Sequence, residues 1–258
     1  MLPTSRRTAS VVLGSLFASM LGGMMMLTGG SASAAEITVF CTQALRTSLL
    51  ELAPRFEKAT GHKVHVVVAP SGQLVKKVND GEAADLLIAN ADNIDALIKS
   101  GNVGGERVHI ARAQVGLSIK AGNPRPDISS PEAVRKALLD AKAISYSAGG
   151  LSGNNFEYAM NKLGILDEVK KKAKNSSPAA KLVVSGEADI AVQQISELIA
   201  VEGSELLGPL PAELDQVTQF SMGVLSDSKS KDTVRALLDY LRTPEAQAVI
   251  KTKGLTPG

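Results

Sequence analysis

A short strand-like run that ends in small polar residues and passes directly into a helix is the feature that most constrains this chain. Residues 37–45 read ITVFCTQAL: β-forming apolar residues give way to Thr42 and Gln43, and a helix-like pattern begins at Ala44. The first turn of such a helix has backbone N–H groups without a partner inside the helix, and the helix dipole makes that end attractive to an anion. We therefore expect an anion site at this turn.

The same arrangement recurs twice further along the chain. In residues 65–78 (HVVVAPSGQLVKKV), Ser71 and Gly72 separate a strand-like run from a helix, and we expect Ser71 to cap that helix. Residues 147–155 (SAGGLSGNN) form a third turn, with Ser152 and Gly153 near the start of a helix predicted from Phe156. Neither a G-x-G-x-x-G nor a P-loop pattern is present, so this stretch is weak as a nucleotide signature.

Strand-like and helix-like stretches alternate along most of the chain. This alternation is typical of βαβ units and predicts an α/β fold with mainly parallel sheets, whose ligands bind at the carboxyl ends of the strands. Residues 108–120 and 217–225 are longer extended segments, which we expect to connect two lobes. Ser130 and Pro131 open one of the helices, with Ser130 as the N-cap.

Residues 1–35 have the pattern of a secretory signal peptide. Arg6 and Arg7 precede a nearly uninterrupted apolar run at 11–27, and Ala-Ser-Ala at 32–34 is a small-residue cleavage motif. A retained membrane anchor is the alternative, but the run is short for a spanning helix and is weakened by Gly22, Gly23, Gly29 and Gly30. We expect cleavage near Ala34-Ala35 and a periplasmic protein.

Composition excludes several classes of function. Removing Arg6 and Arg7 from the 28 basic residues leaves 26, equal to the 26 acidic ones, so no nucleic-acid or anionic-membrane surface is expected. The chain has no Trp and few other aromatic residues to stack on a sugar. Its single Cys, Cys41, has no partner for an internal disulfide, and its three His do not form a zinc pattern, so we expect no metal and no cofactor.

The chain resembles a known family over all of its predicted mature part. The resemblance rests on ITVFCTQALR, FEKATGHKV, PSGQLVKKVNDGEAADLLIANADNIDALIKSG, NKLGI, VVSGEADIAVQQISEL and LLDYLRTPEAQAVIKTKG. These segments are similar to periplasmic solute-binding proteins of ABC importers, specifically the molybdate-binding type. The resemblance implies a type II fold with lobe 1 at 36–112 plus 221–258, lobe 2 at 113–220, and a ligand cleft between them. It also implies a small oxyanion ligand, an inner-membrane permease as partner, a monomer and no enzymatic activity.

The family's ligand contacts transfer only in part. Ser71 matches the Ser of the second loop, whereas the Ser of the first loop falls on Ala44 and the family's Tyr falls on Gln194. The third-loop contact falls near Ser152, and the fourth near Ser176. Together with the turns, the resemblance predicts these ligand-binding positions: Thr42, Gln43, Ala44, Ser71, Gly72, Ser152, Gly153, Ser176 and Gln194.

Two other functions remain open from the sequence. A small organic carboxylate would suit the amide of Gln194 and the guanidinium groups of Arg46 and Arg112 better than a tetrahedral oxyanion would. An exported hydrolase is the weakest alternative, because the chain has no G-x-S-x-G nucleophile elbow.

Overall fold

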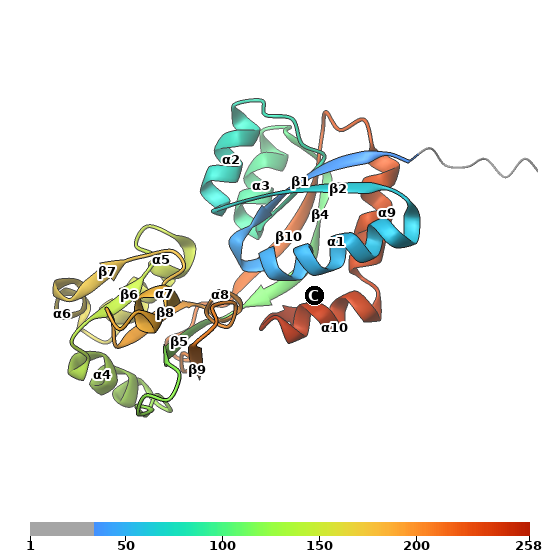
Figure 1. Ribbon diagram of the computed structural model, residues 1–258. Coiled ribbons are helices and arrows are strands. Elements are labelled where there is room, and N and C mark those ends of the chain that lie inside the picture. Colours follow the sequence, from blue (N-terminus) through green and yellow to red (C-terminus); the bar gives the residue numbers. More distant parts are fainter. Residues whose placement is uncertain (1–33) are drawn as a thin grey trace, which may run out of the picture. The chain divides into compact units, whose positions relative to one another are not determined.

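Two mixed sheets organise residues 34–258, the part of the chain that the computed structural model describes (Figure 1). The first sheet has the strand order β11–β4–β10–β3–β1–β2, and the second has the order β7–β6–β8–β5–β9. The strands of the first sheet are β1 (Glu36–Thr42), β2 (Lys63–Ala69), β3 (Leu86–Asn90), β4 (Val103–Ala113), β10 (Thr218–Leu225) and β11 (Thr256–Pro257). Those of the second are β5 (Val115–Lys120), β6 (Ile144–Tyr146), β7 (Ala173–Asn175), β8 (Ile190–Gln194) and β9 (Ser204–Pro209).

Helices pack on both sheets. The first sheet carries the short 3-10 turn η1 (Gln43–Leu45) and helices α1 (Arg46–Thr60), α2 (Ser71–Asn79), α3 (Ala91–Lys99), α9 (Lys231–Leu241) and α10 (Pro244–Thr252). The second carries α4 (Pro131–Asp140), α5 (Leu151–Lys162), α6 (Leu166–Lys171), α7 (Ala180–Val184) and α8 (Ile195–Leu198). Val39 and Cys41 lie in one apolar core and Phe40 in another, as side-chain alternation requires of a strand covered on both faces.

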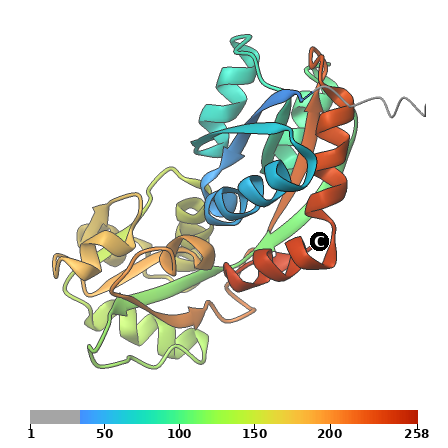
Figure 2. The ribbon, with the colours of Figure 1, turned by 45° about the vertical axis from the view of Figure 1, so that its right-hand side comes forward.

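The prediction of mainly parallel sheets is wrong in one respect. Parallel pairing is confined to the βα units: β1 with β2 and β3, and β6 with β7 and β8. Strands β4, β5 and β10 pair antiparallel with their neighbours. The reason is the connectivity, because these strands take the chain from one sheet to the other and back (Figure 2). The passages lie at Gln114, between β4 and β5, and in the segment between β9 and β10.

Helices α4, α2 and α5 differ in how closely their starts match the predictions. Ser130 caps α4, accepting a hydrogen bond from the backbone N–H of Ala133 at 3.1 Å, as predicted. Ser71 is not an N-cap, because Pro70 holds that position and Ser71 is the first helical residue. Helix α5 begins at Leu151 rather than Phe156, which places Ser152 and Gly153 inside its first turn.

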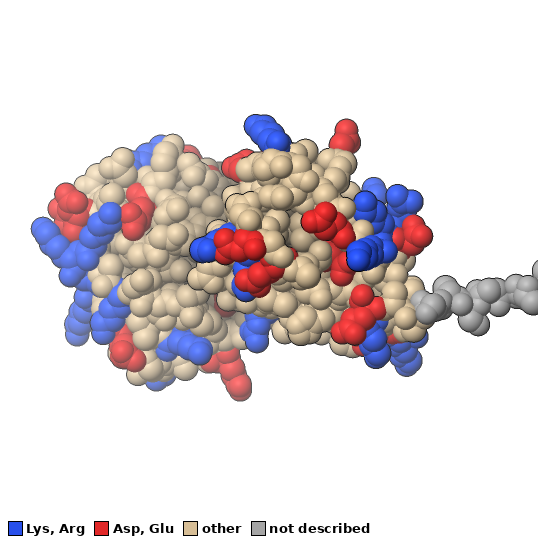
Figure 3. Space-filling view, turned by 90° about the horizontal axis from the view of Figure 1, so that it is seen from above, with Lys and Arg blue, Asp and Glu red and all other residues tan. Residues whose placement is uncertain are grey.

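The predicted signal peptide lies outside the described residues, apart from its last two positions. Within residues 34–258, no helix combines the length and the apolar character that crossing a membrane requires. Figure 3 shows one face of the molecule, where basic and acidic side chains are interspersed rather than gathered into a patch of one sign.

Candidate functional site

The carboxyl ends of three parallel strands lie side by side in the first sheet. Thr42 is opposite Ala69 across the β1–β2 pair, and Cys41 is opposite Ile88 across the β1–β3 pair. The turn η1 and helices α2 and α3 therefore all begin at the same edge of the sheet. In the second sheet, α5 and α8 follow β6 and β8, which are also parallel neighbours.

The helices that begin at these strand ends have uncapped N-termini. The N-cap positions of α2, α3 and α5 are Pro70, Asn90 and Gly150, and none of them makes a side-chain capping bond. By contrast, Ser130 caps α4, and Thr243 caps α10. The first-turn N–H groups of α2, α3 and α5 are thus not occupied by their own caps, which favours an anionic ligand there.

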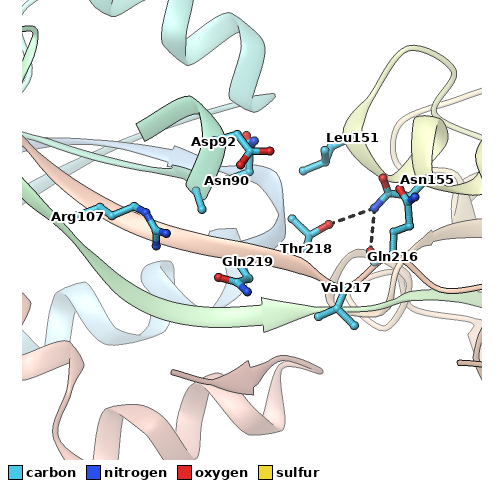
Figure 4. Close-up of a pocket in the computed structure, with 10 residues that line it drawn as sticks. Asn90, Asp92, Arg107, Leu151, Asn155, Gln216, Val217, Thr218 and Gln219 are labelled. Atoms are coloured by element: carbon cyan, nitrogen blue, oxygen red, sulfur yellow. Dashed lines mark hydrogen bonds between the residues drawn. The ribbon is translucent and has the colours of Figure 1, made fainter. Parts of the chain in front are cut away.

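A pocket of about 360 Å³ lies between the start of α3 and the start of α5 (Figure 4). Its lining comes from the first sheet, from helices α3 and α5, and from the segment before β10: Asn90, Ala91, Asp92, Arg107, Leu151, Asn155, Gln216, Val217, Thr218 and Gln219. Amide, hydroxyl and guanidinium groups predominate in this lining. Its position at the carboxyl ends of strands, between two α/β units, is where ligands bind in open α/β folds.

Two side chains of the pocket are fixed by hydrogen bonds. The Nδ2 of Asn155, in α5, donates to the backbone oxygen of Gln216 at 2.9 Å and to Oγ1 of Thr218 at 3.3 Å (Figure 4). The guanidinium of Arg107, in β4, donates from Nε to Asp95 at 2.8 Å and from Nη1 to Ser221 at 3.2 Å. Within residues 34–258, Nη2 of Arg107 makes no hydrogen bond to the protein, so this nitrogen can donate to a ligand.

None of the predicted ligand-binding residues lines this pocket, although Ser152 follows Leu151, which does. Thr42, Ala44, Ser71, Ser152 and Gln194 are all buried close to the strand and helix ends described above. The Oγ of Ser71 donates to Oγ1 of Thr42 at 2.9 Å.

The other four predicted positions, Gly72, Gly153, Ser176 and Gln43, also lie outside the lining of this pocket. Gly72 is exposed on α2. A Cβ on Gly153 would lie 1.9 Å from the backbone oxygen of Ser147, so glycine is required there by packing. The Oγ of Ser176 donates to the backbone oxygen of Pro178 at 3.1 Å within its own turn, and Gln43 lines a second pocket.

Sequence reasoning missed Asn90, Arg107, Asn155, Thr218 and Gln219. One of them carried a usable signal: Asn90 ends a buried strand and precedes a helix, which is the pattern that singled out the other turns. The other four lie within elements, where their residue types alone give no such signal. Arg112, which the carboxylate alternative named, is exposed on β4, whereas the arginine that reaches the pocket is Arg107.

The second pocket has a volume of about 510 Å³ and lies near α8. Gln43 and Arg46 line it from η1 and α1, beside the first sheet. Ser177, Lys181 and Glu197 line it from the side of the second sheet. Burial raises the pKa of the Glu197 carboxyl to about 7. The Nε2 of Gln193 donates to Glu197, and Oε1 of Gln193 accepts from the backbone N–H of Ala179 at 2.8 Å.

The described residues give little support to metal or thiol chemistry. Within residues 34–258, no group of three or more His, Cys, Asp or Glu side chains is placed to hold a metal ion. Cys41 is fully buried, and this burial raises the pKa of its thiol, which keeps the thiol protonated.

Comparisons with known proteins agree with this architecture. A family model described as bacterial extracellular solute-binding protein matches residues 37–256. An aconitate isomerase from a Pseudomonas species is 30% identical over 229 residues, covering 86% of this chain and 87% of the relative. A molybdate-binding protein from Azotobacter vinelandii is 25% identical over 237 residues, covering 87% and 91%. A solved structure of the Azotobacter vinelandii periplasmic molybdate-binding protein superposes with a TM-score of 0.73 at 19% identity, covering 85% of this chain and 98% of that one.

Proposed function

The chain belongs to the bacterial extracellular solute-binding protein family, and we propose that it captures a small organic polycarboxylate between its two sheets for an ABC importer. The observation that carries this proposal is the pocket of Figure 4. There the uncapped N-termini of α3 and α5 lie near the guanidinium of Arg107 and several side-chain amides. Such a lining offers guanidinium and amide N–H donors to a carboxylate ligand.

The size of the pocket favours a polycarboxylate over a tetrahedral oxyanion. A volume of about 360 Å³ falls within the usual range of small-molecule sites, roughly 300–1,000 Å³. A tetrahedral oxyanion is comparable in size to a few water molecules, each of which takes about 30 Å³ of the liquid. It would leave most of this pocket to solvent.

The chemistry of the lining points in the same direction. The family's first-loop hydroxyl is replaced by Ala44, and its Tyr by Gln194, so two side-chain donors to an oxyanion are missing. Arg107 and Gln219 instead present a guanidinium and an amide, beside one carboxylate, that of Asp92. A guanidinium matches the planar geometry of a carboxylate and can bind it through two parallel hydrogen bonds.

The Pseudomonas relative supplies the first compound to test. Its name identifies aconitate, an unsaturated tricarboxylate, as the compound on which that protein acts. We therefore place cis- and trans-aconitate first among the candidate ligands of this chain.

A tetrahedral oxyanion such as molybdate is the second candidate. It is favoured by the hydroxyl groups of Thr42 and Ser71, which lie 2.9 Å apart at the start of two βα turns. The oxyanion would then bind at this pair rather than in the larger pocket.

Thermal unfolding of the purified protein distinguishes the two ligands. The panel contains cis- and trans-aconitate, citrate, succinate, molybdate, tungstate, sulfate and phosphate. A ligand present at a hundred times its Kd adds about 2.7 kcal/mol to the stability. Stabilisation by the polycarboxylates alone supports the proposal, whereas stabilisation by molybdate and tungstate alone replaces it with the second candidate. No stabilisation by any compound rejects both.

Arg107→Gln locates the binding site. We expect this variant to bind the polycarboxylate 10- to 100-fold more weakly, because a hydrogen bond to a charged group contributes about 1.5–3 kcal/mol. Arg135→Gln, on the exposed surface of α4, is the matched control and should bind as the parent protein does. Equal affinity of both variants would place the ligand elsewhere.

The proposal includes export and delivery to a permease. We expect residues 1–35 to be removed on export, and mass spectrometry of the protein recovered from the periplasm gives the new N-terminus directly. A chain that keeps its first residues would instead be membrane-anchored.

A further inference from the structure

Asn155 offers a ligand in the pocket of Figure 4 an acceptor rather than a donor. Its Nδ2 donates to the backbone oxygen of Gln216 at 2.9 Å and to Oγ1 of Thr218 at 3.3 Å. A side-chain amide nitrogen carries two hydrogens, so both are engaged by the protein. Among the hydrogen bonds within residues 34–258, none ends on Oδ1 of Asn155, so this oxygen is left to accept from a ligand.

Asp92 adds a second acceptor on the other side of the pocket. It is the second residue of α3, whereas Asn155 lies in α5 (Figure 4). In the part of the chain that the structure describes, the carboxylate of Asp92 forms no ion pair. An acidic residue in a first turn also stabilises its helix through the dipole. A test of Asp92 therefore needs a control at the same position of another helix.

The positive charge of the pocket is already balanced inside the protein. The guanidinium of Arg107 lies 2.8 Å from the carboxylate of Asp95. Asp95 follows Asp92 by three positions, and residues at this spacing are neighbours on one face of a helix. Two carboxylates thus stand near one guanidinium, which leaves an excess of one negative charge. A ligand that also supplies a donor to Asp92 is favoured over one that brings only further carboxylates.

We propose that this pocket selects polycarboxylates that also carry a hydrogen-bond donor, a hydroxyl or an ammonium group, on a carbon next to a carboxylate. Nη2 of Arg107 and the amide of Gln219 bind the carboxylate of the ligand. The carboxylate of Asp92 and Oδ1 of Asn155 accept hydrogen bonds from its donor group. This inference rests on the proposed function for the polycarboxylate class, and it goes beyond that function by naming which members of the class bind best.

The order of the candidate ligands changes with this inference. Aconitate comes first in the panel because of a relative's name. It has three carboxylates but no hydroxyl or ammonium group, so it gives Asp92 no donor. We therefore expect aconitate to bind more weakly than the best polycarboxylate that carries such a group.

Two matched series of ligands test the inference by titration calorimetry of the purified protein. Succinate, malate and aspartate share a four-carbon dicarboxylate skeleton and differ in whether one inner carbon bears hydrogen, a hydroxyl or an ammonium group. Tricarballylate and citrate repeat the comparison of hydrogen with hydroxyl at six carbons. We expect the best donor-bearing member to bind at least about tenfold more tightly than its parent skeleton, because its donor gains a hydrogen bond to a charged acceptor.

Asp92→Asn tests the residue that reads the donor. The amide carries no charge and can donate to a carboxylate, so we expect this variant to bind succinate more tightly than the parent protein does. The same variant should lose the preference for the donor-bearing ligand. A residue that only stabilised α3 would instead weaken every ligand alike. Asp232→Asn, at the second position of α9 and also exposed, is the matched control and should keep the parent's order of affinities.

The titrations separate this inference from the proposed function. Binding of succinate or tricarballylate as tight as that of the donor-bearing members overturns the inference and leaves polycarboxylate binding intact. A preference for donors that survives in Asp92→Asn overturns the role of Asp92. No binding of either series or of aconitate rejects the proposed function and the inference with it. A preference for malate and citrate supports the inference with a hydroxyl as the donor, and a preference for aspartate alone supports it with an ammonium group.

Discussion

The hydroxyl of Ser71 donates a hydrogen bond to Oγ1 of Thr42 at 2.9 Å, which joins the last residue of β1 to the first residue of α2. Both residues are buried. The bond links two turns that are 29 positions apart in the sequence. It therefore fixes the relative position of two helix starts at the edge of the first sheet.

A double-mutant cycle measures this bond. We expect Thr42→Val and Ser71→Ala each to lower the free energy of unfolding by about 1–3 kcal/mol, because each leaves one buried hydroxyl or its acceptor unpaired. The double variant should lose about 1 kcal/mol less than the sum of the two single losses, because the second substitution removes a bond that the first has already broken. Urea denaturation at neutral pH gives the three values, and full additivity would show that the two hydroxyls are not coupled.

Gly153 and Gly72 occupy the first turns of α5 and α2, and their substitution should have opposite effects. Gly153→Ala forces a Cβ to within 1.9 Å of the backbone oxygen of Ser147, so we expect the variant to lose several kcal/mol or to fail to fold. Gly72→Ala meets no atom within 4 Å and should be neutral or stabilising by up to about 1 kcal/mol. Thermal melts compare the pair. A stable Gly153→Ala protein would contradict this packing.

Asn155 connects α5 to β10 at the pocket of Figure 4. We expect Asn155→Ala to bind the polycarboxylate about tenfold more weakly, since it removes the two hydrogen bonds that hold the pocket wall. Asn154→Ala, exposed on the same helix, is the matched control. Titration calorimetry measures both affinities. If the two variants bind equally well, Asn155 has no part in the site.

Glu197 should make the protein less stable as the pH rises. Its pKa in the folded protein is about 7, above the ordinary value of 4.5, so the protonated carboxyl is favoured by folding. The stability is therefore complete below pH 4.5 and decreases as the pH passes through 7. Arg46 and Lys181, the charged groups that line its pocket, are present in parent and variant alike.

Glu197→Gln removes this dependence, because the amide does not ionise. At pH 8 we expect the variant to be more stable than the parent by an amount of order 3 kcal/mol, at about 1.36 kcal/mol per unit of pKa. At pH 4.5 the difference should be small. Urea denaturation across this range gives both curves. Parallel curves would mean that Glu197 ionises as an ordinary surface carboxyl does.

The sequence by itself determined the elements and their kind. Apolar alternation in residues 37–41, the helical spacing after Ala44 and the cap at Ser130 are local patterns, and each is read within one element. Together with the family resemblance, these patterns were sufficient to predict the α/β class and two sheets with flanking helices. They also predicted the turns at Thr42, Ser71 and Ser152, which are buried.

Only the tertiary structure decided which polar side chains share a pocket. Asn155 and Thr218 are 63 positions apart and become hydrogen-bonded only because folding brings the start of α5 beside the start of β10. Glu197 lines the same pocket as Arg46 and Lys181 only because α8 contacts η1. Periodicity in a sequence records which face of an element is buried, but not which other element buries it. That choice depends on strand order and on the path of the chain between the two sheets, which is set by packing across the whole molecule.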